Sequence, residues 1–279
     1  ASKGVIRIGS KNFTEQFVLG ELIAQSIERA TPLIVERRFN LGSVVVCHRA
    51  MIHGDIDIYP EYTGTGFRVI LSKHDDASPG KILRSVRREY RSRFDIQWLE
   101  PFGFNNTFAV AVRENYAEKN NLQTISDLRG LARALSFAMS PEFHERPDGF
   151  VQFTNRYQLS FGETREMDLA LMYRAVQAGH ADVLVGNSTD GRIPAYGLKI
   201  LEDDRNFFPA YFAAPLVRRE VLEQHPEIRE ALEPLAHSLN ERTMQALNFA
   251  VDEQGKTPRA VARDFLEQHI WIRSPSGTT

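Results

Sequence analysis

Apolar and polar positions alternate over residues 5–9 and then meet a loop, which predicts a strand at the start of the chain. Apolar residues recur at helical spacing over 17–27, so a helix is expected there, with Asn12 or Thr14 as its N-cap. The next expected elements are a strand at 33–39, a helix at 43–53, a strand at 55–59 and a loop at 60–66. This alternation of strands and helices indicates a parallel α/β sheet.

An aromatic-rich segment around 97–107 precedes a second α/β set, and we interpret it as a crossing between two lobes. The second set is expected to contain strands at 108–112, 134–138 and 181–185, helices at 124–128, 149–157 and 167–178, and a loop at 186–191. Residues 198–201 and 211–217 are expected to be extended, and 219–269 to form three helices. The predicted lobes are therefore 1–105 with the returning segment 211–279, and 106–210.

A further helix is predicted at 79–94, and it is unusually basic. Its cationic residues are Lys81, Arg84, Arg87, Arg88, Arg91 and Arg93. Taken together, these six residues do not line one side of a helix. The expectation is therefore a solvated outer surface.

Composition narrows the possible partners. The 279 residues include 34 Lys+Arg and 36 Asp+Glu, a net charge of −2. This argues against a nucleic-acid partner, because nucleic-acid-binding proteins carry a basic excess.

No apolar run approaches the roughly 20 residues that span a bilayer, and no signal-peptide pattern stands at the start of the sequence. Cys47 is the one cysteine, so an intrachain disulfide is excluded, and its apolar neighbours predict a core position.

Catalytic and cofactor motifs must be considered, because loops after parallel strands also carry enzyme sites. The glycines at 64–66 lack the third glycine of a dinucleotide fingerprint. The segment 186–190 departs from a nucleophile elbow at Asp190. The histidine spacings fit no metal motif. We therefore expect no cofactor, no metal and no catalytic residue, and an enzyme is kept only as an alternative from another class.

Several predicted strand ends share an aromatic side chain beside a hydrogen-bonding group. These residues are Phe13 with Lys11 and Asn12, Tyr59 and Tyr62 with Thr63 and Thr65, Phe108 with Asn106 and Thr107, Phe143 with Arg146, and Tyr211. Ring faces attract a cation that has no N–H to donate, at roughly 0.5–2 kcal/mol each, while lysine and arginine bind an opposite carboxylate. Packing explains any single ring equally well, so the prediction of a small zwitterionic ligand rests on their joint placement.

The chain resembles the substrate-binding proteins of glycine betaine/carnitine/choline ABC importers. The resemblance is carried by GSKNFTEQ (9–16), GDIDIYPEYTGT (54–65), GFNNT (103–107), STDGRI (188–193), LEDD (201–204), FFP (207–209) and AAPLVR (213–218). These motifs occur in order over nearly the whole chain. The resemblance implies a non-enzymatic protein with a two-lobed type II periplasmic-binding-protein fold of the α/β class, whose ligand cleft between the lobes closes over the solute.

The resemblance also implies roles for individual residues. Tyr62, Phe108, Asn187 and Tyr211 stand where the family holds an aromatic cage around a quaternary ammonium, with Phe13 adjoining, and Lys11, Thr65 and Arg146 stand where it holds a carboxylate. Family members commonly carry tyrosine at the places of Phe108 and Asn187. Loss of one ring costs up to roughly 2 kcal/mol, or about thirtyfold in affinity. We expect either weak betaine binding or a bulkier ligand that hydrogen-bonds Asn187.

The implied partners are a quaternary ammonium solute (glycine betaine, choline, carnitine or a related betaine) and the membrane permease of an ABC importer. The implied location is periplasmic or otherwise extracytoplasmic, with or without a membrane anchor, and the expected state is a monomer. Two alternatives stay open. One is an amino-acid receptor, in which Asp190 or Glu142 pairs with a primary ammonium and Arg146 binds the carboxylate. The other is a ligand-binding domain of a sensor or permease fusion.

Overall fold

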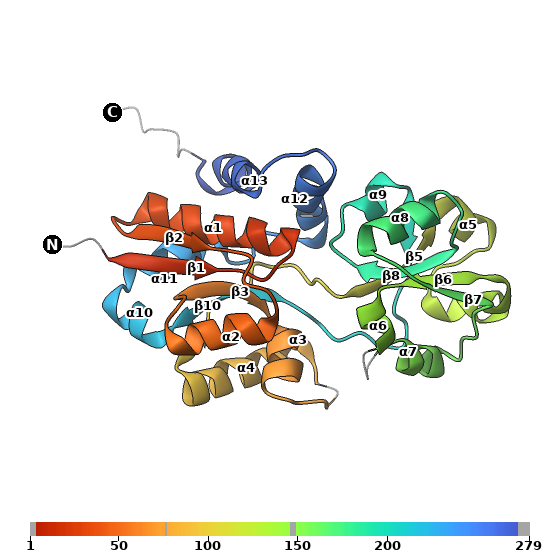
Figure 1. The fold of residues 1–279 in the computed structure, drawn as a ribbon, viewed down its shortest axis with the longest axis horizontal. Helices are drawn as coiled ribbons and strands as arrows, with labels where there is room; N and C mark the ends of the chain where they lie inside the picture. The colour runs from red at the N-terminus through yellow and green to blue at the C-terminus, as the bar shows by residue number, and fades with distance from the viewer. Residues whose placement is uncertain (1–3, 76, 146–148, 273–279) are drawn as a thin grey trace, which may run out of the picture. The chain divides into compact units, whose positions relative to one another are not determined.

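The computed structural model describes residues 4–75, 77–145 and 149–272. The chain divides into two compact units (Figure 1): unit 1 holds 1–105 and 210–279, and unit 2 holds 106–209. Residue 210 belongs to unit 1, whereas the predicted second lobe, 106–210, includes it. Among the described residues, no helix is both long and apolar enough to cross a membrane.

Unit 1 is built on a five-stranded sheet in the order β2-β1-β3-β10-β4. Its strands are β1 (Val5–Gly9), β2 (Ile34–Arg38), β3 (Ile58–Tyr62), β4 (Ile96–Trp98) and β10 (Ala213–Arg218). β1 runs parallel to β2 and β3, whereas β10 is antiparallel to β3 and β4. The carboxyl ends of β1 and β3 therefore lie at the same edge of the sheet as the amino end of β10.

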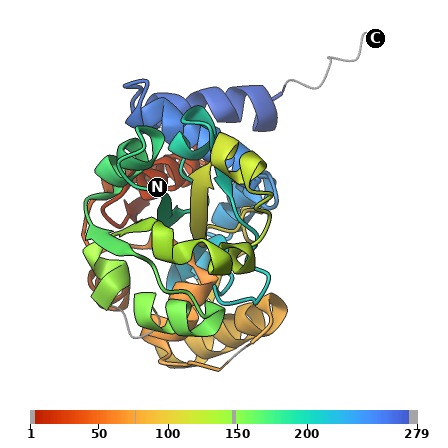
Figure 2. The same cartoon turned by 90° about the vertical axis from the view of Figure 1, so that its right-hand side faces the viewer.

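Helices cover both faces of this sheet. They are α1 (Thr14–Ala30), α2 (Val44–His53), α3 (Thr63–Thr65), α4 (Pro79–Phe94), α10 (Arg219–Gln224), α11 (Glu227–Leu232), α12 (Glu241–Asp252) and α13 (Pro258–Phe265), with π-helical turns at Gly66–Ile70 and Leu266–Ile270. Both views show α1 with the blue C-terminal helices on one side of the sheet and the light-orange α4 on the other (Figures 1 and 2). Two separate apolar clusters, one on each face, form the core of the unit.

Unit 2 repeats this topology, with strand order β7-β6-β8-β5-β9. Its strands are β5 (Phe108–Arg113), β6 (Ser136–Met139), β7 (Glu163–Glu166), β8 (Val183–Asn187) and β9 (Leu198–Ile200), and its α-helices are α5 (Glu114–Lys119), α6 (Pro141–Glu145), α7 (Phe150–Tyr157), α8 (Leu169–Gln177) and α9 (Arg192–Ala195). β5 is antiparallel to β8 and β9, as β10 is to its neighbours in unit 1. In both sheets the antiparallel strand is the first element after the chain crosses from the other unit.

Several predicted elements need correction. The strand expected at 55–59 is observed at Ile58–Tyr62, so it includes a proline that the prediction placed in a loop. Pro60 lies opposite Pro215 of β10, so the two residues that lack a backbone N–H face each other in the strand pair. The N-cap of α1 is Phe13, while Asn12 is exposed and Thr14 donates its hydroxyl to Asp252 at 2.6 Å.

Two further predictions, a strand and the C-terminal helices, differ from the structure, and one prediction, the basic helix, agrees with it. The polar edge strand β7 was not predicted, because its exposed side chains show no apolar alternation. The tail expected to form three helices contains four α-helices, because the short α10 and α11 are separated by a turn at Pro226. The basic helix at 79–94 is confirmed with the expected bounds.

Cys47 lies in the core of unit 1, as expected, and is fully buried. Burial raises the pKa of its thiol to about 12, and the nearby Glu61 carboxylate adds to the increase. The thiolate is the reactive form of cysteine, so the native protein should resist thiol reagents near pH 8.

We expect Ellman's reagent at pH 8 to modify Cys47 far more slowly in the native protein than in urea, where the ordinary thiol pKa is restored. Released thionitrobenzoate, followed by absorbance, measures both rates. Equal rates in the native and unfolded protein would show that the thiol is accessible, contrary to the structure.

Candidate functional site

The candidate residues of unit 1 gather at one edge of its sheet. Tyr62 is the last residue of β3, and Ala213 of β10 is paired with it. Tyr211 precedes β10 by two residues, and Lys11 follows β1, whose carboxyl end lies at the same edge. Thr65, in α3 directly after β3, is half-buried. The topology thus brings together residues that are up to 200 positions apart.

A buried ion pair organises this edge. The Lys11 ammonium donates to the carboxylate of Glu61, which has no exposed surface. The same carboxylate accepts the Tyr59 hydroxyl at 3.1 Å and the backbone N–H of Tyr62 at 2.8 Å. A buried charge is tolerated when it is paired and hydrogen-bonded in this way. Glu61 was not predicted as a site residue, although it lies inside the motif 54–65.

The Lys11 ammonium also lies over two aromatic rings. Its Nζ is 4.7 Å from the ring centroid of Tyr62 and 5.7 Å from that of Phe13. The rings are stacked, with centroids 6.3 Å apart and planes inclined by 18°. Cations are attracted to ring faces at distances within about 6 Å. Tyr62, predicted in the cage, and Phe13, predicted to adjoin it, are therefore arranged so that one cation lies over both rings.

Tyr62 is held by a second buried carboxylate. Its hydroxyl donates to Glu15 at 2.6 Å, and the side-chain amide of Asn248 donates to the other oxygen of Glu15 at 2.9 Å. Burial, followed by the charge of Glu15, raises the pKa of Tyr62 well above its usual value. The phenol stays protonated at neutral pH and keeps its ring orientation. Glu15 and Asn248 were missed, because their link joins α1 to α12, 233 positions apart.

Tyr211 is positioned by its backbone and by a glycine. Its N–H donates to the side chain of Asn105 at 2.7 Å. Its ring packs against Gly64, where an added Cβ would lie 2.6 Å from the ring and 2.7 Å from the carbonyl oxygen of Ala210. Any larger residue at 64 would push the ring away.

In unit 2, Phe108 and Asn187 lie directly opposite each other on β5 and β8. The Phe108 ring is 5.2 Å from Phe143 and 5.8 Å from Phe208. Phe143 is 1% exposed and belongs to the apolar core of the unit, so its packing role is clear. Asn106 and Asn187 are half-buried. Arg146 lies outside the described residues.

The carboxylate of Asp190 is already engaged within unit 2. It accepts Nε of Arg192 at 2.9 Å and Nη2 at 2.7 Å, a bidentate pair that is more than nine-tenths buried on both sides. The Arg192 guanidinium in turn lies 4.9 Å from the ring centroid of Tyr173. A ligand ammonium would have to compete with this arginine for Asp190. Glu142 is exposed on α6.

We predict that Glu61→Gln lowers the free energy of unfolding by about 3–5 kcal/mol, because it leaves a buried ammonium without its counter-charge. Urea denaturation measures the change. The matched control is Glu100→Gln, which breaks the exposed pair with Arg87 and should cost about 1 kcal/mol or less. Equal losses in the two variants would contradict the assigned role of the buried pair.

Comparisons with known proteins agree with this architecture. The family model described as the substrate binding domain of ABC-type glycine betaine transport system matches residues 4–268. Carnitine transport binding protein OpuCC of Listeria monocytogenes is 38% identical over 274 residues, which are 98% of this chain and 89% of that protein. Ergothioneine transport permease/ergothioneine binding protein EgtU of Helicobacter pylori is 33% identical over 262 residues, 94% of this chain and 47% of that protein.

A solved structure described as a crystal structure of glycine betaine/carnitine/choline ABC transporter has a TM-score of 0.89, with 34% identity over 95% of this chain and 98% of that chain. The predicted two-lobed type II periplasmic-binding-protein fold is thereby confirmed. The matching family consists of binding domains and not of enzymes. The chain belongs to the family of substrate-binding domains of ABC-type glycine betaine transport systems.

Proposed function

We propose that this chain is an extracytoplasmic receptor that captures a quaternary ammonium solute and delivers it to the permease of an ABC importer. Membership of the substrate-binding family supports the delivery role. The single observation that supports the ligand class is the position of the Lys11 ammonium over the rings of Tyr62 and Phe13. Those ring faces already accommodate a cation.

The chemistry of a methylated nitrogen favours ring faces. A trimethylammonium group has no N–H to donate, so a carboxylate gains no hydrogen bond from it, whereas an aromatic face attracts its charge. Phe13 is the most exposed of the unit 1 rings at 37%, while Tyr62 and Tyr211 are buried at 4% and 9%. We therefore assign the first contact with the ligand cation to Phe13.

Lys11 has two roles in this proposal. It competes with the ligand cation for the rings of Tyr62 and Phe13, and it supplies positive charge to a ligand carboxylate. A betaine has a group for each of these interactions. Its quaternary nitrogen binds the ring face, and its carboxylate pairs with the Lys11 ammonium. Glu61 stays bonded to Lys11 and limits how far the ammonium moves. We propose that Arg146 and Thr65 complete the carboxylate contacts.

Unit 2 contributes a less aromatic surface. Phe108 provides one half-buried ring, and Asn187 opposite it provides an amide where the resemblance led us to expect a tyrosine. This favours a ligand with a hydrogen-bonding group beyond the trimethylammonium, such as a betaine bulkier than glycine betaine. The bidentate engagement of Asp190 by Arg192 weighs against the alternative of a primary amino acid.

The decisive experiment is a thermal-shift and calorimetric screen of glycine betaine, choline, carnitine, ergothioneine and the common amino acids. A ligand at 100 times its dissociation constant adds about 2.7 kcal/mol to stability, so a true ligand raises the melting temperature clearly. We expect quaternary ammonium compounds to do so and primary amines to have no effect. Binding of primary amines alone would refute the ligand class.

Phe13→Leu tests the ring face within the same screen, because it keeps apolar bulk and removes the π system. We expect the affinity for the best quaternary ligand to fall about two- to fivefold, as for one exposed cation–π contact. Phe13→Tyr, which keeps a ring, is the matched control and should bind like the original chain. If both variants bind equally, Phe13 makes no cation–π contact.

Asn187→Tyr tests whether the ligand is glycine betaine or a bulkier betaine. Restoring a ring should tighten glycine betaine binding by up to about thirtyfold if the missing aromatic face is what limits affinity. The same change should weaken a bulkier betaine that uses the amide of Asn187. Isothermal titration calorimetry with glycine betaine, carnitine and ergothioneine measures both effects. Unchanged affinity for all three would remove Asn187 from the site.

A further inference from the structure

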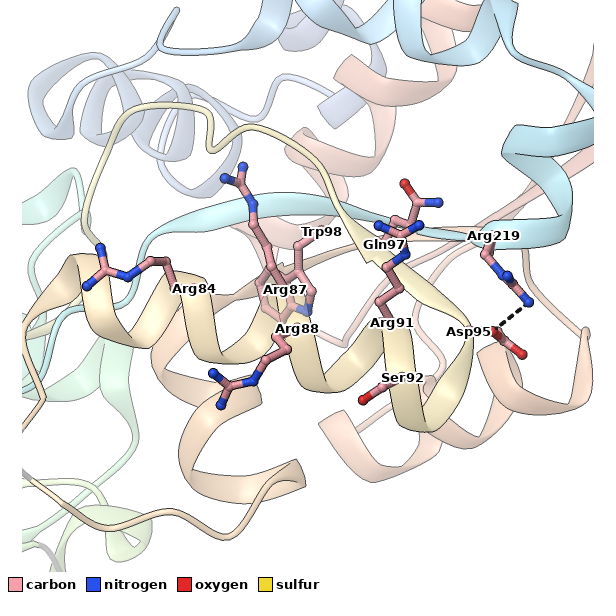
Figure 3. Close-up of a pocket in the computed structure, with 9 residues that line it drawn as sticks. All are labelled: Arg84, Arg87, Arg88, Arg91, Ser92, Asp95, Gln97, Trp98 and Arg219. Atoms are coloured by element: carbon pink, nitrogen blue, oxygen red, sulfur yellow. Dashed lines mark ion pairs between the residues drawn. The ribbon is translucent and has the colours of Figure 1, made fainter.

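Unit 1 has a cavity whose lining residues differ from those of the candidate solute site. The cavity, of about 710 Å³, runs beside α4 and β4 (Figure 3). Its charged lining residues are Arg84, Arg87, Arg88 and Arg91 of α4, Arg219 at the start of α10, and Asp95. We call this cavity the arginine groove. The lining thus contains five guanidinium groups and one carboxylate, in a chain whose net charge is −2.

The groove corrects the sequence-based interpretation of α4. Positions 84, 87, 88 and 91 follow the i, i+3, i+4, i+7 spacing that places residues on one face of a helix. They therefore line one side together, although the full set of six basic residues does not. At about 1.5 Å per residue, this face extends about 10 Å along the helix axis.

The charges of the groove are only partly compensated. Arg219 pairs with Asp95 at 2.9 Å, Arg87 with Glu100 at 2.7 Å, and Arg88 with Glu89 at 3.2 Å. Glu89 is shared with Lys73 on its other side. Within the described ranges, the side chains of Arg84 and Arg91 form no ion pair or hydrogen bond, and both are exposed. Two cationic groups thus remain available at a spacing of two helical turns.

We propose that the arginine groove binds the phosphate groups of an anionic lipid surface. Guanidinium groups bind phosphate oxygens in a bidentate manner, and they do so better than other cationic side chains. The arginines are spread along an exposed helix, which suits several separate phosphates better than one small enclosed anion. The transport family of this chain works with a membrane permease, so a bilayer is a surface that the protein meets. Lipid binding would hold the receptor near that membrane.

Sedimentation with vesicles tests the proposal on the full 279-residue chain. Neutral galactolipid vesicles, with and without phosphatidylglycerol, are the probes. Phosphatidylcholine is avoided because its quaternary ammonium headgroup could be recognised by the proposed solute site. We expect binding that requires phosphatidylglycerol and weakens as salt is raised. Absence of phosphatidylglycerol-dependent binding at low salt would overturn the proposal.

The double variant Arg84→Gln/Arg91→Gln should weaken vesicle binding by about thirtyfold, the value for loss of two arginine contacts with an anionic surface. The matched control is Arg133→Gln/Arg259→Gln, which removes the same charge from two exposed arginines outside the groove and should bind nearly as the original chain. Urea denaturation checks that both variants are folded. Equal losses of vesicle binding in the two variants would show that only the net charge of the protein matters, and would overturn the proposal.

Soluble anions distinguish the lipid surface from other occupants. Inorganic tripolyphosphate and polyglutamate are titrated by calorimetry into the original chain and the groove variant. Groove-dependent binding of either compound without vesicle binding would identify a soluble phosphate or an acidic protein as the occupant and refute the lipid source. Vesicle binding that is lost with Arg84 and Arg91 supports the lipid surface, whether or not tripolyphosphate competes for it.

Discussion

The contact between Glu61 and Lys11 determines how unit 1 can present its aromatic residues. Glu61 is fully buried on β3, and it is stable there because an ammonium, a phenol and a backbone N–H all donate to it. This carboxylate fixes Lys11 over the rings of Tyr62 and Phe13. A free lysine at this position would extend into water, since exposed lysines keep their rotamer entropy. The buried charge therefore decides where the lysine ammonium, and with it the candidate site, lies.

A second carboxylate, that of Glu15, orients the ring of Tyr62 by binding its hydroxyl group. Tyr62 donates to Glu15, which is also bound by Asn248 from the C-terminal helices. The C-terminal segment thus does more than cover the sheet of unit 1, because it completes the hydrogen bonds behind a candidate ligand contact. Without Asn248, the Glu15 carboxylate would lose one of its buried donors.

The common topology of the two sheets accounts for where the candidate residues fall. Each sheet places the carboxyl end of a parallel strand beside the amino end of the antiparallel strand, β3 beside β10 and β8 beside β5. Tyr62 with Tyr211, and Asn187 with Phe108, occupy these junctions. Phe143 was expected in the same group, but it packs among Phe108, Phe153 and Phe208 in the core of unit 2. The aromatic pattern alone does not show how exposed a ring is: Tyr62 and Tyr211 are also buried, whereas Phe13 is 37% exposed.

The sequence by itself determined the family, the α/β class and most helices and strands, because hydrophobic periodicity and local motifs depend only on neighbouring residues. Local motifs also made Lys11, Phe13 and Tyr62 candidate site residues, and the structure places these three side chains together. The partners of these residues were decided only by the tertiary structure: Glu61 for Lys11, Glu15 and Asn248 for Tyr62, and Arg192 for Asp190. Burial and long-range pairing set which charges are compensated, and neither property can be calculated from a residue and its neighbours in the chain.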